Sequence, residues 1–157
     1  QLTGVFSREW LVPIAQTLGN LGCEKTWVVH GSDGSDEITT TGITHVASLE
    51  NGEVTTFDLS PSDAGLSKAN STDLKGGDSA YNAAAIRRLL SGEPSAYRDV
   101  VLFNAAAALI IAGEVSNLKA GVDRAAAAID DGQAQTVLDK MVEITNLRRE
   151  LDEEEIE

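Results

Sequence analysis

The sequence predicts an α/β fold, in which a β-α-β unit and a β-hairpin form part of a mixed sheet and a C-terminal run of helices covers it. Three observations lead to this class. The first 30 residues place a helical apolar pattern between two short apolar runs. An Asn-Gly pair then joins two segments of alternating side chains. From residue 79 onward, apolar residues recur at helical spacing between glycines.

The composition indicates one domain built from small side chains. A chain of 157 residues can bury a sizeable core. Apolar residues make up 42% of it but aromatic residues only 4%, so we expect close helix packing. The single cysteine, Cys23, excludes an internal disulfide and suits a reducing cytoplasm, and we expect it to be a small hydrophobic residue rather than a nucleophile.

The charge pattern limits the possible partners. A net charge of −13 argues against nucleic acid, because phosphate backbones need a basic surface. An anionic small molecule is still compatible, since metal ions and helix N-termini can hold phosphate locally. No run of 18 apolar residues predicts a membrane span, and Gln1 does not begin a secretory leader, so we expect a cytoplasmic protein.

The opening residues predict the β-α-β unit. Residues 1–6 form the expected first strand and 26–30 the second, which should be parallel to it with a right-handed crossover. Between them, Ser7 is the expected cap of a helix that ends near Gly19. The apolar face of that helix is Leu11, Ile14, Ala15 and Leu18.

The middle of the chain predicts a hairpin. Residues 44–49 should pair with residues 54–59 across Asn51-Gly52, because this dipeptide favours the tight turn that matches strand twist. His45 lies in the first of these strands, where we expect a packed or surface histidine rather than a catalytic one.

The remaining residues predict a long loop and four helices. Residues 60–77 are rich in Pro, Ser, Asp and Gly, and Asp78 should cap the helix that follows rather than leave its amides free for an anion. The helix at 97–111 is alanine-rich and, after Arg98 and Asp99 in its first turn, apolar apart from Asn104, so it should be the buried central one. The last helix, from 133 to about 151, should turn four residues inward: Val137, Leu138, Met141 and Ile144.

The most informative stretch follows the second strand. Three carboxylates, Asp33, Asp36 and Glu37, lie just beyond its carboxyl end, where open α/β sheets collect ligands. Such oxygen ligands suit a hard cation. An EF-hand is excluded because the twelfth loop position is Thr44 rather than glutamate. The acids could equally be solvated loop residues, and His30 beside them is a further candidate functional residue.

Three segments together resemble one enzyme family, anthranilate phosphoribosyltransferase. They are the stretch from Thr26 to Glu37 (TWVVHGSDGSDE), the helix entry from Leu74 to Ile86 (LKGGDSAYNAAAI) and the segment from Arg98 to Leu109 (RDVVLFNAAAAL). Their order and spacing fit as well. The resemblance covers residues 1–146 as the C-terminal part of that family's α/β domain, and residues 147–157 are an acidic extension beyond it, either a helix end or disordered.

The resemblance implies a fold and a function. The fold would be an incomplete large domain of the nucleoside phosphorylase and phosphoribosyltransferase type. The function would be glycosyl transfer in tryptophan biosynthesis, joining anthranilate to phosphoribosyl pyrophosphate with release of pyrophosphate. Asp36 and Glu37 match the carboxylate pair that holds Mg²⁺ in the family, whereas Asp33 falls in the variable part of the loop. No side chain of this chain is expected to be a catalytic nucleophile, since the attacking amine belongs to the substrate.

The sequence also departs from the family. The Gly-Thr-Gly-Gly-Asp phosphate loop, the Lys-His-Gly-Asn motif and the arginine that contacts anthranilate are not found in it. The resemblance therefore implies a missing N-terminal portion as partner, little turnover without it, and a homodimer only in the complete enzyme. Two alternatives stay open: a pyrimidine-nucleoside phosphorylase-like enzyme, and a non-catalytic binding or assembly module of the same fold.

Overall fold

The core of the structure is a four-stranded mixed sheet in the order β1-β2-β3-β4. The computed structural model describes the backbone of residues 1–154 and the side chains of residues 1–146. β1 is parallel to β2, whereas β2, β3 and β4 are antiparallel neighbours. The predicted α/β class with a mixed sheet is therefore confirmed. The strands span Leu2–Gly4, Lys25–Gly31, Thr44–Glu50 and Glu53–Leu59.

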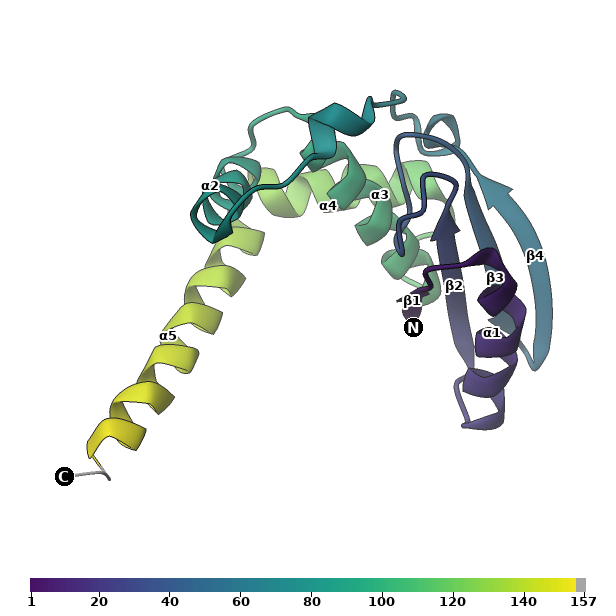
Figure 1. Cartoon of the computed structure of the whole chain (residues 1–157), viewed down its shortest axis with the longest axis horizontal. Coiled ribbons are helices and arrows are strands. Elements are labelled where there is room, and N and C mark those ends of the chain that lie inside the picture. The colour runs from purple at the N-terminus through teal and green to yellow at the C-terminus, as the bar shows by residue number, and fades with distance from the viewer. Residues whose placement is uncertain (155–157) are drawn as a thin grey trace.

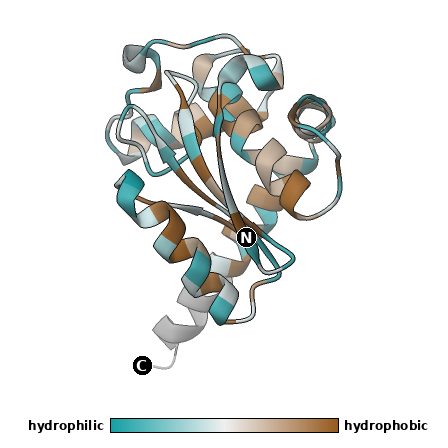
Figure 2. Ribbon diagram, turned by 90° about the vertical axis from the view of Figure 1, so that its right-hand side faces the viewer, coloured by the Kyte–Doolittle hydropathy of each residue, from teal (hydrophilic) through white to brown (hydrophobic). Residues whose placement is uncertain are grey.

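Helices cover both faces of this sheet. Successive side chains of β2 point to opposite faces, so Val28 packs against helix α1 (Leu11–Asn20) while Trp27 and Val29 pack against helix α3 (Ala96–Ile111). Figure 2 shows the brown, hydrophobic segments along the strands and on the helices beside them. Because β2 is buried on both sides, it reads as a continuous apolar run rather than an alternating one.

The start of α1 differs from the prediction. Ser7 does not cap an α-helix; its hydroxyl donates to the Glu9 carboxylate at 3.2 Å. A 3₁₀ turn at Arg8–Trp10 comes first, and the α-helix begins at Leu11. Pro13 therefore lies in the first helical turn, where its missing N–H costs no hydrogen bond. Proline geometry, rather than the serine, determines where this helix starts.

The hairpin forms as predicted. β3 and β4 pair in register from Thr44 opposite Leu59 to Glu50 opposite Glu53. Asn51 and Gly52 both have positive φ, 53° and 80°, as the tight two-residue turn requires. Asn51 is the only non-glycine residue with positive φ among those described.

Helix α3 is central, as predicted, and joins the sheet to a helical layer. The remaining helices are α2 (Ser79–Leu90), α4 (Leu118–Asp130) and α5 (Gln133–Glu154). Asp78 caps α2 by accepting from the Tyr81 amide at 2.8 Å, so the capping prediction is confirmed.

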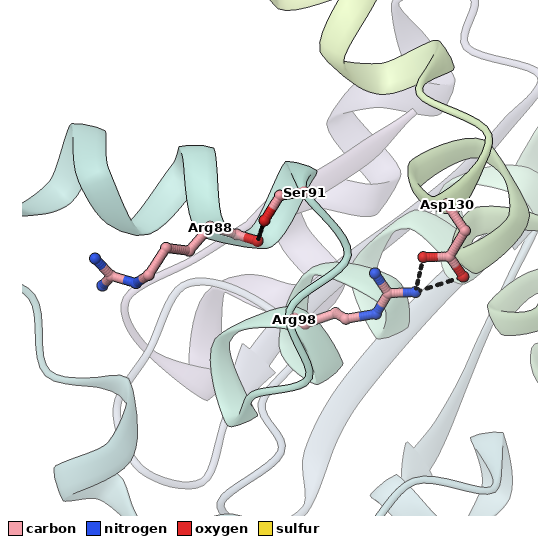
Figure 3. Close-up of polar contacts among 4 residues, drawn as sticks. All are labelled: Arg88, Ser91, Arg98 and Asp130. Atoms are coloured by element: carbon pink, nitrogen blue, oxygen red, sulfur yellow. Dashed lines mark hydrogen bonds and ion pairs between the residues drawn. The ribbon is translucent and has the colours of Figure 1, made fainter.

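An ion pair joins two of these helices. Near the start of α3, one nitrogen of Arg98 donates to both carboxylate oxygens of Asp130, at 2.8 and 3.0 Å, which connects α3 to the end of α4 (Figure 3). Arg88, whose carbonyl accepts from Ser91, points its side chain away from this pair (Figure 3).

Helix α5 extends away from the rest of the molecule (Figure 1). The prediction that four of its residues turn inward is wrong: Val137, Met141 and Ile144 are 69%, 56% and 52% exposed, and Leu138 is only half-buried. Periodicity places these residues on a helix but does not supply a surface to cover them. The helical backbone continues to Glu154, while the side chains of the acidic extension lie outside the described residues. None of the described helices is both long and apolar enough to cross a bilayer.

Candidate metal site

The acidic residues lie in an ordered loop, residues 32–43, between β2 and β3. Its ends are tied together, because the Ser32 amide donates to the Ile43 carbonyl at 2.8 Å. Near its start, the Gly31 amide donates to the Ser35 carbonyl and the Gly34 amide donates to the Gly31 carbonyl, both at 2.9 Å. The loop therefore has a defined shape before any ligand is considered.

Asp33 is the hydrogen-bonding centre of this loop. One of its oxygens accepts from the hydroxyls of Thr39 and Thr41, both at 2.6 Å. The other accepts from the Ser35 hydroxyl at 2.7 Å and from the Ser35 amide at 3.2 Å. Sequence reasoning assigned Asp33 to the variable part of the loop and missed this role. The local signal was present, because an aspartate two residues before a serine favours such a turn.

Both sides of the Asp36-Glu37 pair are packed against other elements. A β-carbon on Gly4 would overlap the carbonyl oxygen of Asp36, so strand β1 approaches the loop as closely as only glycine permits. On the other side, Ile38 is fully buried in the core that contains Phe103. The backbone that carries the two carboxylates is thus held between β1 and α3.

Electrostatics distinguish the acids in the loop. Partial burial of Asp33 opposes its ionisation, but the hydrogen bonds from Thr39, Thr41 and Ser35 outweigh this effect and lower its pKa well below the ordinary value. Glu37 behaves in the opposite way. Surrounding protein atoms raise its pKa by removing water from the carboxylate, and the charges of Asp36 and Asp33 raise it further. Hydrogen bonds within the protein stabilise the Asp33 carboxylate, whereas no positive group among the residues with described side chains compensates the charge of Glu37.

The predicted metal pair therefore has the donor chemistry of a hard-cation site. Asp36 and Glu37 are adjacent and exposed, and neither carboxylate accepts a hydrogen bond within the described part of the chain; the Ser35 hydroxyl reaches only the backbone carbonyl of Glu37. Two carboxylates suffice for Mg²⁺, which commonly completes its six ligands with water and phosphate oxygens. No cluster of three or more metal-ligating side chains occurs among the residues with described side chains. The pair fits an ion shared with a substrate, not a closed protein cage.

A shallow polar depression of about 580 Å³ adjoins the loop on the Asp33 side. Lys68 contributes a cationic group to it, and the other lining residues are Asp33, Thr41, Ala69, Asn70, Ser71 and Thr72. Asp36 and Glu37 do not line it. The Ala69 amide donates to the Thr40 carbonyl at 2.9 Å, which joins the 60–77 segment to the acidic loop.

The other residues considered from the sequence have structural contacts. His30 places Nδ1 2.8 Å from the Val5 carbonyl, which makes this nitrogen the donor and directs it toward the segment just after β1, not toward the acids. His45 pairs with Asp58 across the hairpin at 2.7 Å. Cys23 is half-buried, and its thiol donates to the Lys25 carbonyl at 3.4 Å.

Comparison with known proteins identifies the family. The profile of the glycosyl transferase family, a/b domain, matches residues 1–135. The chain belongs to this family. Relatives that resemble it include anthranilate phosphoribosyltransferases from Methylocella silvestris and Parvibaculum lavamentivorans, which are 55% and 57% identical over 146 residues. Each match covers 93% of the chain but only 42% and 43% of the relative, so the chain spans about two fifths of their length.

Solved structures of the family share the fold. Anthranilate phosphoribosyltransferase from Thermus thermophilus superposes with a TM-score of 0.79 at 39% identity, over 87% of this chain and 40% of that one. The Saccharomyces cerevisiae enzyme in complex with PRPP and Mg superposes with a TM-score of 0.81 at 26% identity, over 88% and 40%. The predicted resemblance and the predicted fold type are both confirmed by these matches.

Proposed function

We propose that this chain is the C-terminal α/β part of an anthranilate phosphoribosyltransferase and supplies the metal-binding side of its active site. The observation that carries the proposal is the 53–57% identity, over 144 to 146 residues, to eight relatives that all bear this name. The reaction would join the amine nitrogen of anthranilate to the ribose C1 of phosphoribosyl pyrophosphate. The bond from C1 to pyrophosphate breaks, and the amine gives up a proton.

The residues of this chain would act by positioning and charge. Asp36 and Glu37 would offer carboxylate oxygens to Mg²⁺, and Asp33 would keep the loop in the shape that presents them. Bound there, Mg²⁺ would offset the negative charge that develops on the departing pyrophosphate. No nucleophilic side chain is needed, so the contribution of the chain is a preformed electrostatic site.

The partners follow from the same proposal. Family structures hold PRPP with Mg and, separately, 4-fluoroanthranilate, and this supports phosphoribosyl pyrophosphate and anthranilate as the substrates here. The motifs expected to bind phosphate and anthranilate would come from a preceding N-terminal portion. A homodimer of the complete enzyme and a cytoplasmic location are parts of the same proposal. We also propose residues 1–146 as the domain segment and residues 147–157 as an extension of it.

The proposal is tested in a hybrid protein. Residues 1–146 of this chain replace the matching segment of the Methylocella silvestris relative, to which they are 55% identical. We expect the hybrid to release pyrophosphate from phosphoribosyl pyrophosphate only when anthranilate is present. We expect no nucleoside phosphorolysis. A folded hybrid without the first activity would contradict the proposal, and phosphorolysis would favour the phosphorylase alternative.

The metal role is tested by substituting both carboxylates. Asp36→Asn combined with Glu37→Gln should lower turnover and raise the Mg²⁺ concentration needed for half-maximal rate. The effect should be at least as large as the roughly 10- to 100-fold losses seen when groups around a metal are altered. Asp58→Asn, on the outer hairpin, is the control. An unchanged Mg²⁺ requirement in the double variant would remove Asp36 and Glu37 from the metal role.

A further inference from the structure

One polar side chain reaches the acidic loop from the middle of an apolar helix. Asn104 lies on α3 between Phe103 and the alanines that pack on the sheet. Its oxygen accepts from the Ile38 amide at 3.0 Å, and its nitrogen donates to the Ile38 carbonyl at 2.8 Å. The same nitrogen donates to the Val100 carbonyl at 2.9 Å, one turn back along the helix. All the polar atoms of this side chain are thus engaged.

Through these contacts Asn104 pairs with both backbone polar groups of Ile38, as a neighbouring β-strand would. An amide side chain can bind both the N–H and the C=O of one peptide residue only when that residue is held edge-on to it. The residue so held is Ile38, which immediately follows Glu37. Because the Ile38 side chain is fully buried on the same core, it can neither slide along α3 nor rotate out of contact.

The opposite side of the carboxylate pair is held as closely. The backbone of Asp36 rests on Gly4 of β1, where even a methyl group would overlap it. One residue beyond Ile38, the Thr39 amide donates to the Thr44 hydroxyl at 3.0 Å. Asn104 supplies the hydrogen bonds from α3 in this arrangement, next to the apolar contact of Ile38 with the same helix. The contacts at Gly4 and Thr44 come from the sheet.

Such a link is needed because Asp36 and Glu37 carry the same charge. Adjacent carboxylates repel each other, and a free loop would relax by turning them apart. A fixed backbone limits this separation, so that one cation could reach both groups. Residues that orient metal ligands without touching the metal commonly affect affinity this way.

We propose that Asn104 is a positioning residue for the metal site: its amide holds Ile38 so that Asp36 and Glu37 present their carboxylates together to a divalent cation. This inference rests on the proposed function, because it presumes that the pair binds Mg²⁺. It adds a residue on another element, 66 positions away in the sequence, to the parts that determine metal affinity.

The test uses Asn104→Asp in the hybrid protein. Aspartate has nearly the same shape but cannot donate to the carbonyls of Ile38 and Val100. We expect the dissociation constant for Mn²⁺ alone, measured by electron paramagnetic resonance, to rise about 10-fold or more. The carboxylate could still accept from the Ile38 amide, but its second oxygen would repel the carbonyls of Ile38 and Val100 and push the loop away. We therefore also expect faster hydrogen exchange at the Ile38 amide and a higher Mg²⁺ requirement, with the KM for anthranilate little changed.

The matched control is Asn82→Asp. The Asn82 side chain, on α2, also pairs with both backbone groups of one residue: it accepts from the Gly77 amide at 2.9 Å and donates to the Gly77 carbonyl at 3.0 Å. Gly77 is not in the acidic loop. We expect its Mn²⁺ affinity to equal that of the unsubstituted hybrid. Equal losses in both variants would show a general effect of charge or stability and would overturn the inference.

The remaining outcomes separate this inference from the proposed function. If Asp36→Asn with Glu37→Gln leaves Mn²⁺ binding unchanged, the proposed metal role fails. If that double variant loses affinity while a folded Asn104→Asp retains it, only the inference about Asn104 fails. Should Asn104→Asp not fold, Asn104→Ser is measured instead. If neither variant folds, Asn104 determines the fold rather than the metal site, and the inference is overturned.

Discussion

The acidic loop at residues 32–43 and helix α5 lie far apart in the molecule and are stabilised in opposite ways (Figure 1). The loop has almost no regular secondary structure, yet hydrogen bonds to Asp33, the close contact at Gly4 and the clamp from Asn104 fix its backbone. Helix α5 is a regular helix from Gln133 to Glu154, yet Val137, Met141 and Ile144 face solvent.

This difference shows that regular structure and tertiary order are separate properties. A helix forms its hydrogen bonds between residues four apart, so its backbone shape needs no partner surface, although most of its stability in a protein comes from packing. A loop has no such local solution and keeps one shape only if other elements hold it. In this chain the loop bearing the candidate site is held by contacts from β1 and α3, as preorganisation requires. Three substitutions test the comparison, beginning with the largest expected effect.

Gly4→Ala should disturb the loop most. The added methyl would overlap the Asp36 backbone, so either β1 or the loop must move. We expect the free energy of unfolding of the hybrid to fall by about 3 kcal/mol, near the upper end for overpacked sites. Urea denaturation measures this loss. Gly19→Ala is the control, because the nearest atoms to a methyl there belong to the Leu49 side chain, at 3.1 Å and beyond. An equal, small effect of both changes would show that the contact at Gly4 is not rigid.

Asp33→Ala should have an intermediate effect. It leaves the hydroxyls of Thr39 and Thr41 without their acceptor, and Thr39 is buried, so we expect a loss of about 2 kcal/mol at pH 7. Since folding lowers the pKa of Asp33, this stabilisation is complete above its ordinary value of 3.8 and is lost as the pH falls below that value toward the lower folded pKa.

The pH dependence supplies the measurement for Asp33. Urea denaturation of the unsubstituted hybrid and of Asp33→Ala at pH 7, 5 and 3 should give a constant difference between the two higher values and a smaller one at pH 3. Groups common to both proteins cancel in this comparison. A difference that does not change with pH would mean that Asp33 acts through its shape rather than its charge.

Met141→Lys on α5 should have the smallest effect. The side chain is 56% exposed, so we expect the unfolding free energy of the 157-residue chain to change by no more than about 0.5 kcal/mol. Ile129→Lys on α4, at a buried position, is the contrasting change and should be strongly destabilising. A loss for Met141→Lys that appears only in the hybrid would show that the remaining part of the enzyme covers α5. A large loss in the chain itself would contradict the comparison.

The parts of the candidate site that are formed by residues close together in the sequence could be predicted. Asp36 and Glu37 can be found from the sequence because a glycine-bounded strand end and clustered acids follow one another directly. The Asp33 turn could have been found in the same way. Gly4 and Asn104 could not: nothing in the residues around either one indicates contact with a loop from another part of the chain. Asn104 stands out in its apolar helix, but its partner becomes visible only when α3 is packed on the sheet.

By itself, the sequence determined the class of the fold, the Asn51-Gly52 hairpin, the Asp78 cap and the position of the acids after β2, because each depends on backbone preferences and periodicity over a few residues. Only the tertiary structure decided that the Asp36 backbone contacts Gly4, that Asn104 hydrogen-bonds to Ile38 and that apolar side chains of α5 are exposed. The reason is that these features depend on which surfaces meet, and residues distant in the sequence make those surfaces.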